Sequence, residues 1–125
     1  MKRIRSLVFA GALACTALPA FAQDPFGAIV LGRISGGEPS WGLAWSGHGY
    51  DDAGERARNE CYERGAAACL IIGYARAPCA ALAVDDRNGH GAEWGESLDS
   101  AEKSALAACR ARGGTCRIAV SRCAG

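Results

Sequence analysis

The chain has 125 residues and a formal net charge of +1; 50% of its residues are hydrophobic and 22% are charged. This length suits one domain with one modest core and excludes a second domain. The nearly balanced charge excludes the strongly basic surface that nucleic-acid-binding proteins present to phosphates.

The first residues have the three-part layout of a secretory signal peptide. Basic residues stand within Met1–Arg5, an apolar run extends from Ser6 to Pro19, and a small-x-small triplet ends at Ala22. The run is shorter than the about 20 residues that a membrane-spanning helix needs. We therefore predict that residues 1–22 are a signal peptide cleaved after Ala22, and that the protein is periplasmic or secreted without a membrane segment.

A lipoprotein signal is the alternative, with Cys15 as the modified residue. Ala12 stands where a larger aliphatic residue normally precedes such a cysteine, so cleavage after Ala22 explains the segment better. Cleavage removes all the basic residues of the leader and lowers the formal net charge by three.

Residues 23–125 are then predicted to form a single domain with an internal repeat, in which residues about 26–78 resemble residues 79–125. Each half is predicted to contain strand, strand, helix and strand, which gives an α+β fold of two pseudo-repeated units with two helices on one sheet or two small sheets. In chain order we expect strand Gly27–Arg33, strand Trp41–Ser46, a helix capped by Asp52 and ending at Cys61, strand Ala68–Arg76, strand Cys79–Val84, strand Ala92–Gly95, a helix capped by Asp99 and ending at Cys109, and strand Thr115–Ser121.

The two helices are defined by spacing and by end signals. Small residues recur at i, i+4 and i+8, a pattern that favours a helix packed close to a sheet. Acidic capping boxes are predicted at both starts, and glycines are expected to end both helices. The anchors are Ala53, Ala57 and Cys61 against Ala101, Ala105 and Cys109; the capping pairs are Asp52 with Glu55 and Asp99 with Glu102; and the terminating glycines are Gly65 and Gly113 with Gly114.

Loss of Cys15 with the leader leaves an even number of cysteines, which in an exported domain indicates disulfides. A metal site is disfavoured because no pair has C-x-x-C spacing and both histidines, His48 and His90, stand between glycines. We therefore expect neither a metal nor a cofactor. The repeat selects among the 15 possible pairings. It predicts the bridges Cys61–Cys69, Cys109–Cys116 and Cys79–Cys123.

A family resemblance rests on several of these features together. They are Phe26-Gly-Ala-Ile, the alanine-spaced helix ending in a cysteine, Cys69 before an apolar strand, Cys79-Ala-Ala-Leu-Ala, and the second helix-to-cysteine unit. Nearly all of residues 23–125 thereby resembles the family catalogued as domain of unknown function 4189. The resemblance implies a small exported bacterial protein and supplies no catalytic residues. The glycine-rich loop between Arg33 and Ser40 departs from the family's usual pattern.

Two polar segments resemble functional sites. His48 stands beside Asp51 and Asp52, where Asp51 would orient it as a general base, but no serine or cysteine has a spacing that supplies a nucleophile. We favour a loop and helix cap, with no catalytic residue. The loop after Val84 resembles a calcium loop, but its register puts Val84 and Gly95 where ligand oxygens belong. A hairpin turn at Asn88-Gly89 is the better interpretation.

The tryptophans and tyrosines are either core residues or anchors of a protein interface. We assign Trp45 and Trp94 to the core and leave both roles open for Trp41. The candidate partner-binding residues are Trp41, Tyr50 and His48.

The predicted function is non-enzymatic binding of another exported protein, with a periplasmic inhibitor or an immunity protein against a secreted toxin as examples. It rests on small size, a disulfide frame and aromatic residues without a catalytic constellation. We expect neither nucleic acid nor a membrane as partner. A small cell-envelope hydrolase and a structural envelope protein are the alternatives.

Overall fold

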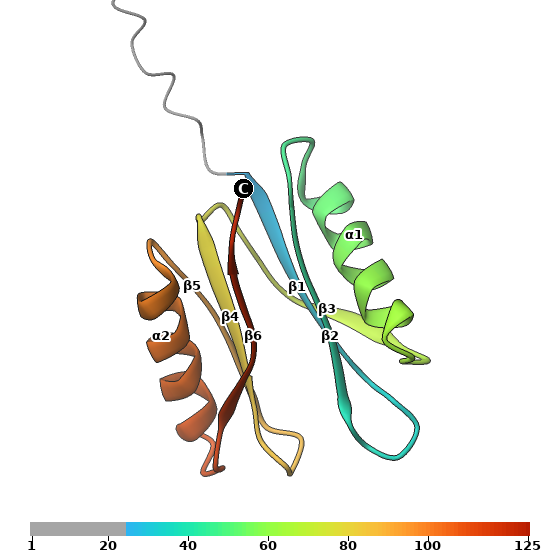
Figure 1. The fold of residues 1–125 in the computed structure, drawn as a ribbon, viewed down its shortest axis with the longest axis vertical. Coiled ribbons are helices and arrows are strands. Elements are labelled where there is room, and N and C mark those ends of the chain that lie inside the picture. The colour runs from blue at the N-terminus through green and yellow to red at the C-terminus, as the bar shows by residue number, and fades with distance from the viewer. Residues whose placement is uncertain (1–24) are drawn as a thin grey trace, which may run out of the picture.

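The computed structural model describes residues 25–125, so the predicted signal peptide, its cleavage site and Cys15 lie outside the described residues. Two helices and six strands follow one another in the order strand, strand, helix, strand in each half of the chain (Figure 1). They are β1 (Phe26–Arg33), β2 (Pro39–Ser46), α1 (Tyr50–Glu63), β3 (Cys69–Ala75), β4 (Cys79–Val84), β5 (His90–Gly95), α2 (Leu98–Arg110) and β6 (Arg117–Cys123).

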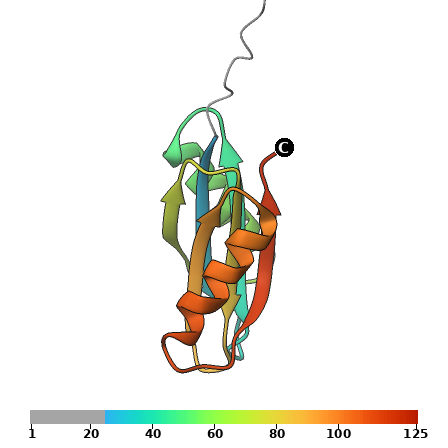
Figure 2. The same cartoon turned by 90° about the vertical axis from the view of Figure 1, so that its left-hand side faces the viewer.

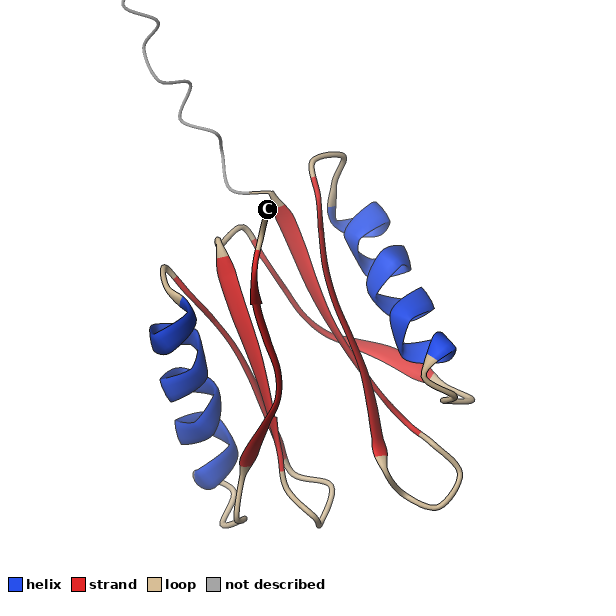
Figure 3. Cartoon of the chain, in the orientation of Figure 1, coloured by secondary structure: helices blue, strands red, loops and turns tan. Residues whose placement is uncertain are grey.

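The strands form two antiparallel sheets that face each other between the helices (Figure 3). The first sheet has the order β2-β1-β3 and the second has the order β5-β4-β6. Helix α1 lies on the outer face of the first sheet and α2 on the outer face of the second (Figure 1). The predicted α+β class is confirmed, and the architecture is four layers with two sheets rather than one.

The central strands β1 and β4 are buried on both faces, because a helix covers one face of each sheet and the other sheet covers the opposite face. Successive side chains of a strand point to these two faces in turn. In β1, Ala28 and Val30 pack against α1, whereas Ile29 packs between the sheets. In β4, Ala81 packs against α2 and Leu82 between the sheets. Full burial of side chains such as Ile29 and Leu82 contributes about 1.5–3 kcal/mol each. Burial on both faces therefore explains why every residue of β4 is apolar.

Each helix lies close to its sheet because a glycine faces it. A β-carbon on Gly42 of β2 would lie 1.7 Å from the carbonyl oxygen of Ala57 in α1, and one on Gly91 of β5 would lie 2.3 Å from that of Ala105 in α2. The predicted small-residue faces are confirmed, since Ala57 and Ala105 are fully buried. Sequence spacing thus identified the contact surface of both helices.

The predicted capping boxes are wrong. Helix α1 begins at Tyr50 after Gly49, which has a φ of 137° and caps without a side-chain hydrogen bond. Helix α2 is capped by Ser97, whose hydroxyl oxygen accepts from the Ser100 amide, while the Ser100 hydroxyl oxygen accepts from the Ser97 amide. Asp52 and Asp99 stand instead in the first turns, where a negative charge favours the helix dipole. Serine serves as well as aspartate at an N-cap, so α2 starts earlier than predicted. Helix α1 also starts earlier, after Gly49.

Other strand boundaries differ from the predicted ones by one or a few residues. Strand β2 begins at Pro39 and β5 at His90, because Arg33 pairs with Pro39 and Val84 with His90. The predicted hairpin at Asn88-Gly89 is confirmed, with Asn88 at a φ of 71°. The expected helix ends are confirmed at Gly65 and Gly113, whereas Gly114 does not have a positive φ.

All three predicted disulfides are confirmed: Cys61–Cys69, Cys109–Cys116 and Cys79–Cys123. The first two join the end of a helix to the following strand within one half. The third joins the start of β4 to the end of β6. By loop entropy the short bridges contribute at most about 2.5 kcal/mol each and the long one about 4 kcal/mol.

Candidate functional site

Three aromatic side chains from three elements meet at one end of the first sheet. Phe26 begins β1, Tyr50 begins α1 and Tyr74 lies near the end of β3. The ring centroids of Phe26 and Tyr50 are 4.8 Å apart at an interplanar angle of 80°, and those of Tyr50 and Tyr74 are 5.1 Å apart at 59°. Tyr50 is 38% exposed and Tyr74 is 43% exposed. We call these three residues the aromatic patch.

Strand pairing and a short loop assemble the aromatic patch. Phe26 pairs with Ser46 at the end of β2, and Tyr74 pairs with Ala28 two residues along β1. Only residues 47–49 separate β2 from α1, so the chain returns beside Phe26 when the helix begins at Tyr50. The rings therefore meet because the start of β1, the end of β3 and the first turn of α1 lie at the same end of the sheet.

Arg76 extends the aromatic patch with a positive charge. Its guanidinium carbon lies 4.2 Å from the centroid of the Phe26 ring, a cation-π distance. Arg76 is exposed, as are Tyr50 and Tyr74. Tyrosine, with other aromatic residues, and arginine are the residue types that dominate the binding energy of protein interfaces.

A polar group surrounds the turn that leads into α1. The Ser46 hydroxyl donates to Asp52, and Arg56 Nε lies 2.9 Å from the same carboxylate oxygen. The hydrogen bond from Ser46, with smaller contributions from Arg56 and His48, lowers the pKa of Asp52 below its usual value of 3.8, although burial acts in the opposite direction. His48 is thus one of the groups that lower the pKa of Asp52.

His48, the sequence-predicted binding residue nearest to Tyr50, is exposed in this turn. Its backbone N–H donates to the Ser46 hydroxyl oxygen over 3.0 Å. The bond fixes the backbone of the turn and leaves the imidazole at the surface beside the first turn of α1. His48 and Tyr50 therefore belong to one region of the molecule.

Trp41 lies apart from that region and is half-buried near the start of β2. The guanidinium carbon of Arg64 lies 3.3 Å from its ring centroid and that of Arg122 lies 5.8 Å away. Arg122 also pairs with Glu60. Because Arg64 covers its ring, Trp41 helps to join α1 to β6 instead of offering a free aromatic face.

The other two tryptophans are core residues, as predicted. Trp45 and Trp94 pack between the sheets with ring centroids 6.3 Å apart at an interplanar angle of 87°. Trp45 Nε1 donates to the carbonyl oxygen of Ala77 over 3.0 Å. The indole N–H of this half-buried tryptophan thereby has a hydrogen-bond partner.

A second surface feature is an apolar groove of about 530 Å³ at the start of β3. We call it the β3 groove. Burial, followed by the charges of Arg112 and Arg33, lowers the pKa of His90 in its wall, against an opposing effect of Asp85. The groove is lined by Leu31, Gly32, Arg33, Ala67, Ala68, Leu70, Ile72, Asn88 and His90.

Sequence reasoning missed both Phe26 and Tyr74 and the β3 groove. Each is assembled from separate elements, and no spacing along one element reveals such an assembly. The available signal was the run from Leu70 to Ile72, because an apolar run without charges is unusual in a strand at the edge of a sheet.

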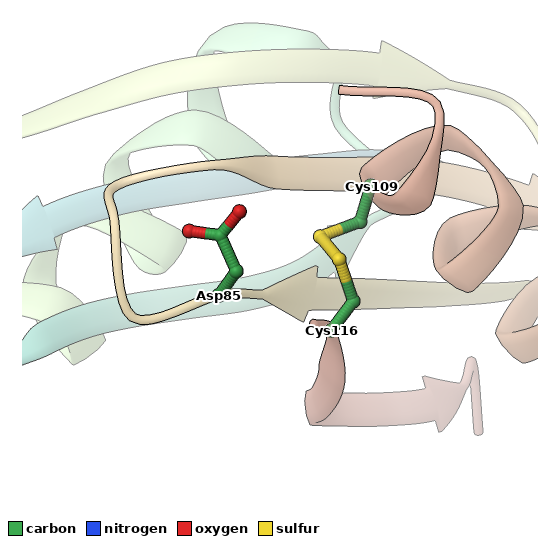
Figure 4. Close-up of side chains that lie close together, drawn as sticks. All are labelled: Asp85, Cys109 and Cys116. Atoms are coloured by element: carbon green, nitrogen blue, oxygen red, sulfur yellow. A yellow bond between two sulfur atoms is a disulfide. The ribbon is translucent and has the colours of Figure 1, made fainter. Parts of the chain in front are cut away.

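Asp85, Cys109 and Cys116 form the one group within residues 25–125 whose side-chain atoms converge as metal ligands do, all within 4.8 Å (Figure 4). The two sulfurs are bonded to each other at 2.07 Å. A closed disulfide offers no thiolate, so in this state the group presents a single carboxylate to a cation. Asp85 Oδ1 accepts from the amides of Arg87 and Gly89, each over 2.7 Å, which assigns this oxygen to the hairpin turn.

The model of the family described as domain of unknown function (DUF4189) matches residues 26–123. The chain belongs to the DUF4189 family. The match begins at Phe26 and ends at Cys123, so it includes both sheets, both helices and all three disulfides of the fold. Comparisons with curated proteins and with solved structures found no match.

Family membership leaves the functional assignment to the geometry of the DUF4189 domain itself. Within residues 25–125 no helix has the length and apolar character needed to cross a membrane. Three disulfides indicate an oxidising environment outside the cytoplasm. Two of the exposed features described above are suited to contact with a partner: the aromatic patch with Arg76, and the β3 groove.

Proposed function

We propose that this DUF4189 domain is an exported, non-enzymatic binding domain that recognises another exported protein through the aromatic patch. The observation that carries the proposal is the contact of three rings from three elements, with Tyr50 and Tyr74 each more than one-third exposed. Rings held in contact before binding lose little conformational entropy when a partner covers them. His48 and Arg76 supply polar contacts at the margin.

The disulfide frame supports this function. The Cys61–Cys69 bridge ties α1 to β3, which are two of the three elements that carry the aromatic patch. The signal-like residues 1–22 and the disulfides support a periplasmic or secreted location. An inhibitor or immunity protein that blocks a secreted toxin fits a rigid binding domain of this size. Trp41, under Arg64, has a supporting role in the frame.

Capture from a periplasmic extract of the source cell tests the proposal. The oxidised domain is immobilised, and bound protein is identified and quantified by mass spectrometry. We expect one stoichiometric protein with the natural sequence and at least a tenfold loss with the double variant Tyr50→Ala, Tyr74→Ala. Direct measurement of Kd with the purified partner follows.

Tyr62→Ala is the matched control because Tyr62 is 46% exposed on the same helix but outside the aromatic patch. It removes the same side chain and is expected to leave Kd within a factor of two. Unchanged binding by the double variant, or equal losses in the double variant and in Tyr62→Ala, contradicts the role of the aromatic patch. Circular dichroism of each variant checks that the fold is retained.

A further inference from the structure

Strands β3 and β6 occupy the same position in their sheets. Each follows the helix of its half, pairs with the central strand and forms one edge of its sheet. An edge strand presents unpaired N–H and C=O groups that attract another strand, and proteins commonly protect such edges with charged side chains. The two halves therefore allow an internal comparison of a protected and an unprotected edge.

The two edges differ in charge. Strand β6 carries Arg117 and Arg122, both exposed, whereas β3 contains no charged residue from Cys69 to Ala75. On β3, Leu70 is 69% exposed and Tyr74 is 43% exposed. Edge protection by charge is therefore present in the second sheet and missing at the equivalent strand of the first.

The position of α1 leaves the β3 edge open. The helix packs mainly over β1 and β2 and contacts β3 less. In the side view β3 lies at the outer margin of the sandwich (Figure 2). The β3 groove begins beside Leu70, and at the other end of the strand Tyr74 belongs to the aromatic patch. One uncharged edge thus joins the apolar groove to the patch.

We infer that β3 is a docking edge at which an extended segment of the protein partner adds as a further strand, placing an aliphatic side chain in the β3 groove. This inference rests on the proposed function and gives the partner's chemistry. Main-chain hydrogen bonds to the edge supply affinity in this mode of recognition, and side-chain pockets supply specificity.

Charge at the two ends of β3 defines the segment that fits. Arg33 lines the β3 groove at one end, and the exposed Arg76 follows Ala75 at the other. The segment has uncharged residues in its middle, facing the uncharged strand, and an acidic residue at each end. Arg76 follows the strand that the segment would join, and opposite charges on neighbouring strands stabilise pairing. Arg33 stands on β1, one strand further in, so its charge attracts an acidic residue of the segment over a longer distance.

The same charges disfavour a second copy of this chain as the occupant. Antiparallel pairing of β3 with itself about Ile72 sets Arg76 of each copy at the level of residue 68 in the other. Arg33 lies at that level because Gly32 pairs with Cys69. Each end of such a pair therefore places two arginines at the same level with one strand between them, and their like charges oppose the pairing.

A peptide probe tests the edge directly. The probe is a peptide of alternating valine and threonine with aspartate at both ends, compared with the same peptide with lysine at both ends. Binding to the oxidised full domain is measured by fluorescence anisotropy, and hydrogen exchange reports on residues 69–75. We expect the acidic peptide to bind at least tenfold more tightly and to slow exchange in β3.

Leu70→Lys should weaken binding of the acidic peptide at least tenfold, although the added lysine attracts its charge. Leu98→Lys is the control, because Leu98 is a 42% exposed leucine on α2. Equal affinity for the two peptides, or unchanged exchange of residues 69–75, overturns the inference. A dimer in light scattering that Leu70→Lys dissociates assigns the edge to a second copy and overturns it as well.

The captured partner separates this inference from the proposed function. Loss of partner binding in Leu70→Lys and in the Tyr50 and Tyr74 double variant supports both. Retention in Leu70→Lys with loss in the double variant overturns the docking edge alone. The reverse pattern overturns the role of the aromatic patch and retains the docking edge.

Discussion

Replacing Asp85 with asparagine is expected to speed reduction of the Cys109–Cys116 bridge and to leave Cys61–Cys69 unchanged. Asp85 is only 9% exposed, and a carboxylate oxygen of Asp85 lies within 4.8 Å of both sulfurs of the bridge (Figure 4). Gly32 holds the equivalent position in the first half, and a β-carbon there would lie 2.8 Å from Cys61 Sγ. The chain thus contains one bridge beside a carboxylate and one without it.

The magnitude follows from the charge that develops during thiol exchange. A reductant thiolate attacks one bridge sulfur, the S–S bond breaks, and the other sulfur leaves as a thiolate that solvent then protonates. A full charge about 5 Å from a carboxylate is repelled by about 3 kcal/mol at an effective dielectric constant of about 20. Because the transition state shares its charge among three sulfurs, about 1.5 kcal/mol remains, which corresponds to about tenfold in rate.

Partial reduction with dithiothreitol at neutral pH, quenched by alkylation and followed by peptide mass spectrometry, measures each bridge separately. Asparagine retains an acceptor oxygen for the amides of Arg87 and Gly89, so the turn is preserved. Asp86→Asn, at an exposed neighbour, is the control for net charge. Equal rates for Cys109–Cys116 in Asp85→Asn and in the natural sequence refute the electrostatic argument, as does an equal acceleration of Cys61–Cys69.

Three further predictions follow from local geometry. Gly42→Ala is expected to destabilise the fold by about 1–3 kcal/mol in urea unfolding, because its β-carbon must displace the Ala57 carbonyl; an unchanged midpoint contradicts this contact. Ser46→Ala should raise the pKa of Asp52 in an NMR titration. Because the pKa of Asp52 is lowered in the folded protein, the Asp52 carboxylate stabilises the fold at pH values above its unfolded pKa of 3.8. This contribution is lost as the pH falls through the folded pKa. The Ser46→Ala variant should therefore lose less stability in acid than the natural chain. Ser97→Ala should cost about 1 kcal/mol through loss of the α2 cap, and a thermal midpoint equal to that of the natural chain argues against that cap.

The repeated parts of the fold were the parts that sequence predicted best. Cys61 and Cys109 each end a helix that has alanines at matching positions, so one half predicted the pairing of the other. Ala57 was predicted to face the sheet, whereas Gly42, the glycine opposite it, is identified only by the structure. Disulfide pairing and helix faces depend on such local spacing, and both were confirmed.

Helix starts were mispredicted because the same residues occur at a cap and in a first turn. An aspartate followed three residues later by glutamate satisfies both patterns at Asp52 and Asp99. Ser97 was available as an equally good N-cap for α2. Only the path of the chain out of the preceding strand decides between them.

The candidate site was found in part for a similar reason. Tyr50 was identified by residue type, whereas Phe26 and Tyr74 join it only when the ends of two paired strands and the start of a helix come together. Trp41 was open to both roles because stacking with Arg64 depends on where α1 ends. Tertiary neighbours, which no single element encodes, decide these cases.

The face shared by the two sheets behaves like an interface between subunits that happen to lie in one chain. Ile29 and Leu43 from the first half meet Leu82 and Val120 from the second across it. Neither half can cover these side chains by itself, since its own helix occupies the opposite side of its sheet. A fragment containing either half alone would therefore expose the whole apolar inner face of its sheet, and we expect it to self-associate or aggregate.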